Sequence, residues 1–196
     1  MVKKIFLTLL LIFSLSKANS FEEFIEKAKK HKGVYIEFTQ ISLIEGFDQQ
    51  TFEGKAFILK DKKIKIEYTS PQKQYILIEG EKSITYIPSE NQVIITKLDQ
   101  DLALIDIFKL LSGALELEKI FSIKAEKDKY ILLPKNPKIK EIKKIVIHFK
   151  DKKPHEIKLY DTENNVVIIK IKKIKYLDSE PNLDINYPID VEIITY

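Results

Sequence analysis

Side chains that could carry catalysis or hold a metal ion are few in this chain. It has three histidines, His31, His148 and His155, at spacings that do not suggest metal ligands, and it has no cysteine. No serine-nucleophile elbow, zinc-binding His pair or glycine-rich phosphate loop occurs. Carboxylates are abundant, and a pair for glycoside hydrolysis could assemble from distant strands without leaving a local motif. We therefore expect no enzyme, cofactor or metal ion, and a secreted hydrolase is the remote alternative.

The chemistry that the sequence does favour is the binding of apolar groups. Between Gly54 and Gly80, the residues Ile64, Ile66 and Tyr68 alternate with charged ones. Because successive side chains of a strand leave on opposite faces, this alternation predicts one apolar and one hydrated face. Such an aliphatic face either packs as an ordinary core or lines a cavity that suits an aliphatic ligand. The pattern alone does not choose between the two.

The elements that must position this face are mostly strands. Segments with strand character fill Val34 to Leu98 and Ser122 to Thr195, joined by short turns. Short links favour antiparallel neighbours, because a parallel crossover needs about a dozen residues or more. A sheet of about eleven strands is not expected to stay flat. We predict a mainly β fold (α+β), with a single antiparallel, strongly curled sheet that forms an incomplete barrel.

One strand carries a sign of bending. In the segment 166–176 the apolar residues change parity after Ile171, because Ile174 falls on the other set of alternate positions. A change of parity within one strand predicts a β-bulge near Lys172 and Lys173, a device that bends a sheet.

Two segments have helical periodicity instead. Phe21 to Lys30 has an apolar stripe, with Ser20 placed to cap its start and Gly33 its end. Asp101 to Gly113 repeats the pattern, and Leu115 to Phe121 can add a short third helix. Because apolar stripes are buried away from water, we expect these two or three helices to cover the concave face as a lid. The predicted lid residues are Phe24, Ile25, Leu104, Ile107, Phe108 and Leu111.

The first 18 residues have the features of a secretory signal peptide. Lys3 and Lys4 precede an apolar run from Ile5 to Leu15, and small residues lead to a cleavage position after Ala18. The run is shorter than the ~20 residues of a membrane-spanning helix, which makes a permanent anchor the less favoured alternative.

Removal of this segment leaves one expected domain, residues 19–196. Three lysines leave with the segment, so the formal charge falls from +4 to +1. A near-neutral chain has no global field for nucleic acid, and we expect no such partner. No cysteine follows the apolar run, so we expect an exported protein without a lipid anchor, most simply a monomer.

Several short motifs, taken in order, resemble a known family. They are Phe38-Thr39-Gln40, Phe52-Glu53-Gly54-Lys55-Ala56-Phe57, Ile66-Glu67-Tyr68-Thr69-Ser70-Pro71 with Gly80 nine residues later, Phe121-Ser122-Ile123-Lys124, Tyr130-Ile131-Leu132-Leu133-Pro134-Lys135 and Leu183-Asp184-Ile185-Asn186-Tyr187-Pro188-Ile189-Asp190-Val191. Their spacing is similar to that of the LolA family of periplasmic outer-membrane lipoprotein carrier proteins. The resemblance covers essentially the whole expected mature chain.

The resemblance implies an unclosed antiparallel barrel with a helical lid over a hydrophobic cavity. It also implies a periplasmic chaperone that takes triacylated lipoproteins from an inner-membrane lipoprotein-releasing ABC transporter to an outer-membrane acceptor lipoprotein. The acceptor shares the fold but carries a lipobox cysteine, which this chain lacks. The alternative on the same fold is a periplasmic sensor or scaffold that recognises lipids or lipoproteins without ferrying them. The expected cavity lining is Phe38, Phe57, Ile64, Ile66, Tyr68 and Leu77.

The resemblance also points to a latch for the lid. The family has an arginine before its W-x-Y strand, thought to bond the backbone of the lid helix. Lys60 stands at that position, Asp61 replaces the usual proline, and the chain contains no arginine. Lysine offers three donors without the planar fork of arginine. We expect Lys60 either to latch the lid or to be an ordinary solvated turn lysine.

Overall fold

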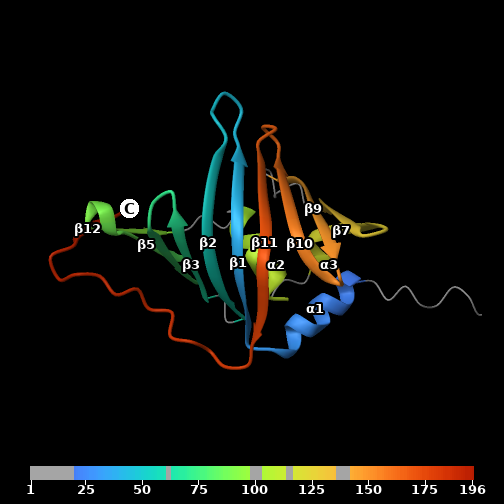
Figure 1. The fold of residues 1–196 in the computed structure, drawn as a ribbon, viewed down its shortest axis with the longest axis horizontal. Coiled ribbons are helices and arrows are strands. Elements are labelled where there is room, and N and C mark those ends of the chain that lie inside the picture. The colour runs from blue at the N-terminus through green and yellow to red at the C-terminus, as the bar shows by residue number, and fades with distance from the viewer. Residues whose placement is uncertain (1–19, 61–62, 98–102, 114–116, 136–141) are drawn as a thin grey trace, which may run out of the picture.

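A single curled sheet of twelve strands forms the computed structural model (Figure 1). The structure describes residues 20–60, 63–97, 103–113, 117–135 and 142–196. The predicted signal peptide, residues 1–18, lies outside them. The strands are β1 (Gly33–Leu43), β2 (Gln50–Leu59), β3 (Lys63–Ser70), β4 (Gln74–Glu79), β5 (Lys82–Ile87), β6 (Gln92–Lys97), β7 (Phe121–Glu126), β8 (Lys129–Pro134), β9 (Ile142–Lys150), β10 (Lys153–Asp161), β11 (Val166–Leu177) and β12 (Glu192–Thr195).

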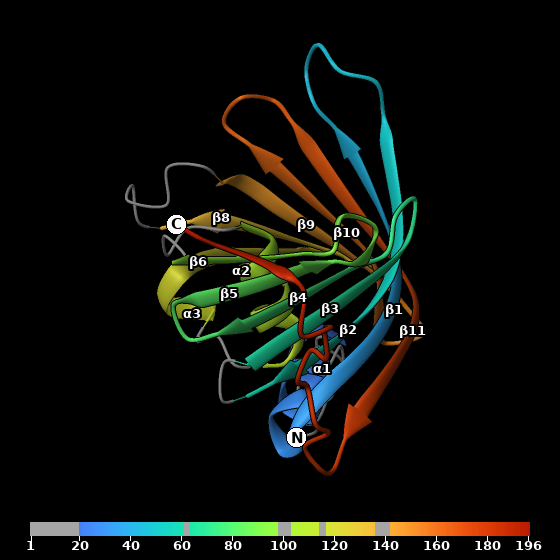
Figure 2. The ribbon, with the colours of Figure 1, turned by 90° about the vertical axis from the view of Figure 1, so that its left-hand side faces the viewer.

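The sheet is two meanders joined in the middle. Its order is β12-β6-β5-β4-β3-β2-β1-β11-β10-β9-β8-β7, so β1 pairs with β11 at the centre and the two ends do not close on each other. Seen from the side, the strands bend around the helices that lie inside the curl (Figure 2). The predicted curled, unclosed sheet is confirmed.

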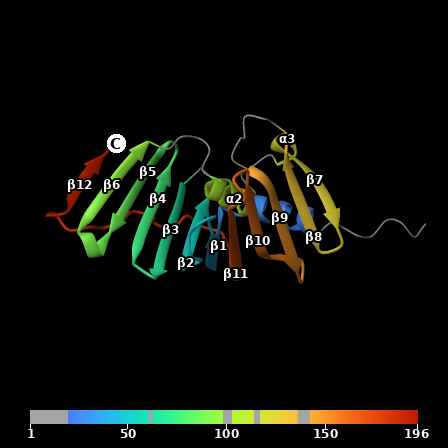
Figure 3. The same ribbon diagram turned by 90° about the horizontal axis from the view of Figure 1, so that it is seen from above.

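The helices are α1 (Ser20–Lys30), α2 (Ala103–Leu111) and the short α3 (Leu117–Ile120), with a 3-10 turn at Pro88–Glu90. Helix α1 has acidic residues in its first turn and basic residues in its last, which suits the helix dipole. Viewed from above, α2 lies within the arc of strands (Figure 3). Among the described residues, every helix is too short or too polar to cross a lipid bilayer.

The predicted bulge is confirmed. Glu37 of β1 pairs with Lys173 of β11, but the next residue, Phe38, pairs with Ile171. Lys172 is therefore the extra residue, and its insertion moves the apolar residues from one parity to the other. This lets both halves of a long strand face the interior while the sheet bends.

Two features differ from the predicted sheet. There are twelve strands rather than about eleven, and β12 runs parallel to β6, so the sheet is not wholly antiparallel. The physical reason for the parallel pairing is the long connection from Asp178 to Val191. It is long enough to carry the chain from the centre of the sheet to its far edge, where β12 joins in the same direction as its neighbour. We call this connection the strap.

Candidate functional site

The concave face of the sheet and the helices enclose one large apolar cluster, here called the inner cluster. From the strands it receives four of the predicted lining residues, Phe38, Ile64, Ile66 and Tyr68, each at most 8% exposed. The inner-face residues share parity across β1, β2 and β3, because Ile64 pairs with Ile58 and Ile66 with Ala56. The structure thus brings these side chains together beneath the helices.

The predicted lid residues reach the same cluster. Phe24 and Ile25 of α1, with Ile107, Phe108 and Leu111 of α2, are buried in it. Leu104 belongs to α2, but its side chain lies outside the described residues.

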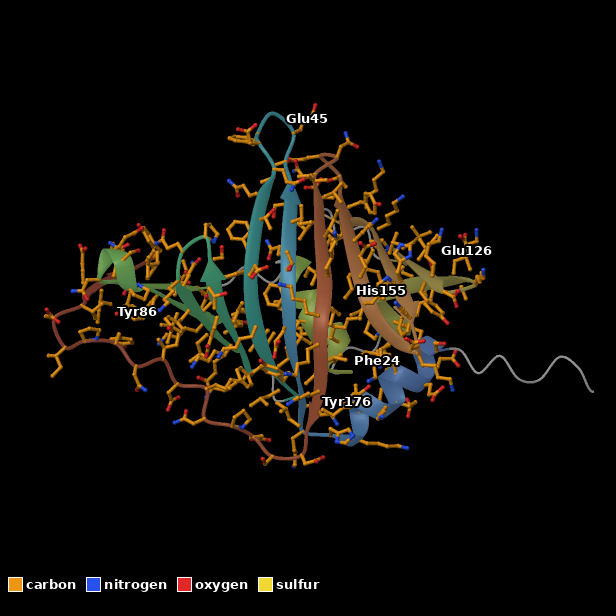
Figure 4. All side chains as sticks on the ribbon, in the orientation of Figure 1. Phe24, Glu45, Tyr86, Glu126, His155 and Tyr176 are labelled. Carbon is orange, nitrogen blue, oxygen red and sulfur yellow. The ribbon has the colours of Figure 1, made fainter. Side chains whose placement is uncertain are left out.

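Aromatic rings make the contacts between the helices and the sheet. The ring centroid of Phe108 lies 5.9 Å from that of Phe38, and the ring centroid of Phe24 lies 6.1 Å from that of Phe149. The ring centroid of Phe24 also lies 6.2 Å from that of Tyr176, and both residues are labelled in Figure 4. The described contact surface between helices and sheet is therefore largely apolar, so it can separate without leaving buried charges unpaired.

The expectation that Phe57 and Leu77 line the inner face is wrong. Phe57 pairs across β2 and β3 with Lys65, and Lys65 pairs across β3 and β4 with Leu77. Directly paired residues point to the same side of a sheet, so all three face outward. Both faces of β2 carry apolar residues, and for this reason hydrophobicity alone did not identify the inward set.

These two residues belong instead to a second cluster on the convex side, here called the outer cluster. The strap covers it: Leu183 is 2% exposed and packs with Leu59 and Leu77. The ammonium of Lys65 donates to the carbonyl oxygen of Asp184 at 3.0 Å, which holds the strap to β3. The sequence prediction included no such cluster.

Other inner-cluster residues were not predicted as lining. Val34 and Ile36 precede Phe38 at the same parity, and Leu132, Ile145 and Ile147 form part of the opposite wall. The alternation in β1 was a sufficient signal for the first two. For the opposite wall, only the pairing of β8 with β9 shows that their apolar residues share the inner side.

Lys60 joins the end of β2 to the end of α1. Its ammonium donates a hydrogen bond to the carbonyl oxygen of Lys29, in the last turn of α1, and its backbone N–H donates to the carbonyl oxygen of Lys32 at 3.2 Å. Carbonyls in the last turn of a helix have no partner within the helix, so they are natural acceptors for a lysine.

The end of α2 packs at the same point. A side chain added at Gly113, which follows α2, would come within 3.1 Å of the Cγ atom of Lys29 and within 3.2 Å of the carbonyl oxygen of Ile25. Gly113 also has a φ of +70°, a conformation that glycine adopts without strain. Lys29 is thus a joint at which α1, α2 and β2 meet.

The polar groups of the described interior are few. Its buried polar side chains are the three serines Ser42, Ser83 and Ser112. The phenol of Tyr68 donates to the Oε1 atom of Gln40 at 2.9 Å, and burial raises the pKa of this phenol from 10.0 to about 12. Such an interior can hold apolar groups, and among the described residues it contains no buried carboxylate, histidine or lysine.

The histidines lie away from the inner cluster. The Nδ1 atom of His31 is 2.7 Å from the Oδ1 atom of Asp178, and its ring stacks on Tyr176. The ring centroids of His148 and His155 are 6.2 Å apart. Both residues line an open cavity of about 550 Å³ beside the turn between β7 and β8. Partial burial lowers the pKa of His148. Within the described ranges, no group of three potential ligands is placed to hold a metal ion.

Residues 29–181 match the family described as "Outer membrane lipoprotein carrier protein LolA". This chain belongs to that family. The LolA match begins in the last turn of α1 and ends within the strap, so it includes α2 and strands β1 to β11 but not Phe24 and Ile25 of α1. The family is named for carrying outer-membrane lipoproteins, and membership supports a role in lipoprotein transport in the periplasm.

Two curated relatives agree with this membership, and a solved structure shares the fold. An outer-membrane lipoprotein carrier protein of Francisella philomiragia is 31% identical over 192 residues, covering 94% of this chain and 90% of the relative. That of Francisella tularensis subsp. novicida is 29% identical, covering 98% and 97%. A conserved protein of Thermus thermophilus has a TM-score of 0.55 at 12% identity, covering 91% of this chain and 99% of that one, which supports the fold alone.

Proposed function

We propose that this protein is a periplasmic carrier that shields the acyl chains of lipoproteins between its helices and the inner face of its sheet. In this proposal it receives triacylated lipoproteins from an inner-membrane lipoprotein-releasing ABC transporter and passes them to an outer-membrane acceptor lipoprotein. The names of its relatives support the cargo class, and the helical lid and its latch at Lys60 are carried over from the family resemblance as part of the proposal.

One observation carries the proposal: helix α2 fills the interior of an unclosed sheet with aliphatic and aromatic side chains. Ile107, Phe108 and Leu111 are completely buried, and Leu110 is 1% exposed. These side chains present the same kind of surface as an acyl chain. A helix that withdraws from such a sheet leaves an aliphatic groove, which an acyl chain can occupy without any new polar partner.

The energetics require a lid that competes with the cargo. Burial of an acyl chain contributes about 0.8 kcal/mol per CH₂, so one long chain approaches about 10 kcal/mol and three chains would be held almost irreversibly. Displacing α1 and α2 from the inner cluster offsets much of this gain. Delivery then needs only an acceptor whose groove is slightly more favourable, since each ~1.4 kcal/mol shifts the distribution tenfold.

The experiment that tests this function is binding of a fluorescent triacylated lipopeptide to residues 19–196. We expect the wild type to bind it and Ile64→Asp to bind at least tenfold more weakly, because the carboxylate enters the inner cluster. Phe57→Asp is the matched control, since it places the same charge on the adjacent strand but in the outer cluster. Circular dichroism checks that both variants fold.

Two results would contradict the proposal: no binding by the wild type, or equal losses in the two folded variants. Transfer of the bound lipopeptide to a purified acceptor separates a carrier from a sensor of the same fold. A sensor would bind the lipopeptide and retain it in the presence of the acceptor.

A further inference from the structure

The turn between β1 and β2 is a protruding tip with exposed apolar side chains. The hairpin extends beyond the rest of the sheet, at the end opposite to α1 (Figures 1 and 2). Phe47 is 74% exposed, Ile44 42% and Leu43 38%. Single exposed apolar residues are ordinary, but three on one projecting turn form a small apolar surface. We call residues 43–48 the tip.

Hydrogen bonds hold the tip in one shape. The N–H of Phe47 donates to the carbonyl oxygen of Ile44 at 3.1 Å, and Gly46 between them has a φ of +81°, which favours glycine. The N–H of Glu45 donates to the Oδ1 atom of Asn165, at the neighbouring turn between β10 and β11, at 3.0 Å.

The neighbouring turn is itself braced. Asp161 accepts hydrogen bonds from the backbone N–H and the side-chain amide of Asn165 at 2.8 and 2.7 Å, and from the N–H of Glu163 at 2.8 Å. The tip is therefore held by a second turn, so Phe47 loses less conformational entropy when it binds a partner. Preorganisation of this kind favours binding.

The charges around the tip are all of one sign. Glu45 and Asp48 belong to the tip, Glu163 lies in the neighbouring turn (Glu45 is marked in Figure 4), and neither 42–51 nor 161–169 contains a lysine or arginine. The chain as a whole has more lysines than acidic residues, so the sign of the net charge around the tip is opposite to that of the whole chain. An anionic lipid surface would repel these carboxylates, whereas a basic protein surface would attract them.

We propose that the tip docks onto a protein partner, inserting Phe47 into an apolar pocket ringed by lysine or arginine side chains. The proposal rests on the proposed carrier function, in which the partner is a membrane-bound protein that hands over or receives the lipoprotein. Because the tip is remote from α1 and Lys60, docking there leaves the lid free to open while carrier and partner stay joined.

The test compares three variants of residues 19–196. Phe47→Ser removes the ring, and Glu45→Lys with Asp48→Lys reverses the charge. Ile189→Ser is the matched control, because Ile189 is fully exposed in the strap, away from the tip. All four substituted positions are at the surface, so the fold is expected to persist and is checked by circular dichroism.

Each variant is measured in three ways. The first is binding of the triacylated lipopeptide. The second is ATP-dependent release of lipoprotein from inner-membrane vesicles and its delivery to outer-membrane vesicles, both from the source bacterium. The third is flotation with protein-free vesicles of phosphatidylethanolamine and phosphatidylglycerol in a ratio of about 3:1, a mildly anionic surface.

We expect all variants to bind the lipopeptide within about twofold of the wild type. Release or delivery should fall about tenfold in both tip variants and stay unchanged in the control, since a ring at the centre of an interface carries much of its affinity. Normal release and delivery by the tip variants would overturn the docking proposal alone. So would a tip-dependent flotation with protein-free vesicles, which would assign the tip to lipid. Failure of the wild type to bind the lipopeptide would overturn the carrier function and, with it, this proposal.

Discussion

Tyr68 lies in the inner cluster and makes both apolar and polar contacts there. Its ring lies 5.9 Å from that of Phe38 and 5.7 Å from that of Phe52, while its hydroxyl donates to Gln40. Burial of the phenol raises its pKa to about 12. The neutral phenol is thus favoured in the folded protein, and this preference has a consequence for stability at high pH.

We expect Tyr68→Phe to change that dependence in a defined direction. The pKa of the Tyr68 phenol in the folded protein lies above its value in the unfolded chain. The contribution of the neutral phenol to the free energy of unfolding is therefore fully present below about pH 10 and is lost as the pH rises towards 12. The variant should lose about 1 kcal/mol at pH 7 through the missing hydrogen bond, yet its free energy of unfolding should fall less steeply between about pH 10 and 11.5. Urea unfolding across this range is the measurement.

The matched variant is Tyr35→Phe. The pKa of Tyr35 is also raised to about 12, by burial first and then by its hydrogen bond to Glu37, but this residue lies on the outer face beside Phe57. If the free energy of unfolding fell equally steeply with rising pH in the wild type and Tyr68→Phe, the raised pKa of Tyr68 would be refuted.

At the scale of elements, Lys60 connects the end of β2 to the end of α1, and under the proposed function we expect this contact to set how firmly α1 is held as a lid. Lys60→Met keeps the aliphatic stem and removes the donor to the carbonyl of Lys29, whereas Lys60→Arg keeps a donor. We expect the Met variant to melt roughly 2–4 °C lower, the effect of about 1 kcal/mol in a domain of this size, and to take up lipopeptide several-fold faster. Thermal denaturation and stopped-flow fluorescence measure the two quantities.

Lys63→Met is a control for loss of a charge near the same turn, since the ammonium of Lys63 pairs with Glu79 on β4. Equal melting and uptake in Lys60→Met and the wild type would leave Lys60 as an ordinary turn lysine.

The elements themselves were largely predictable, and the reason is visible in particular residues. Ile64, Ile66 and Tyr68 alternate with charged residues, so a period of two identified both the strand and its inner face. The parity change after Ile171 located the bulge. Phe57 and Leu77 were misassigned because apolar residues occur on both faces of their strands, and only the pairing register with Lys65 separates the two.

At the scale of the whole molecule, the strap was the feature that local patterns could not predict. Leu183 and Ile185 alternate with polar residues, as in a strand. They pack instead on the convex face of the sheet, in the outer cluster with Leu59 and Leu77, which precede them by more than a hundred residues. Such contacts depend on the assembled convex face, which no short window of sequence contains. The parallel pairing of β12 with β6 follows from the same long-range contact.

The strap should stabilise the fold without taking part in lipid binding. We expect Leu183→Ala to lower the free energy of unfolding by about 2–4 kcal/mol, through lost burial and a cavity beside Leu59 and Leu77. Ile189→Ala, in the same strap but fully exposed, should change it by less than about 0.5 kcal/mol. Urea unfolding provides both values, and lipopeptide affinity should remain unchanged in both. A loss of affinity in Leu183→Ala under conditions in which it is folded would contradict this separation of the two clusters.

The central pairing of β1 with β11 also determines the order in which the chain can fold. Within each meander, strands pair with their neighbours in sequence, so β1 to β6 and β7 to β11 can form from nearby contacts. The β1–β11 ladder brings together residues such as Val34 and Tyr176, and it must wait until nearly the whole chain has been synthesised. Loop-closure entropy makes this ladder slow relative to the local hairpins. Until it forms, the apolar inner faces of both halves are exposed to solvent, so we expect the incompletely folded chain to expose the same apolar surface that the folded protein buries.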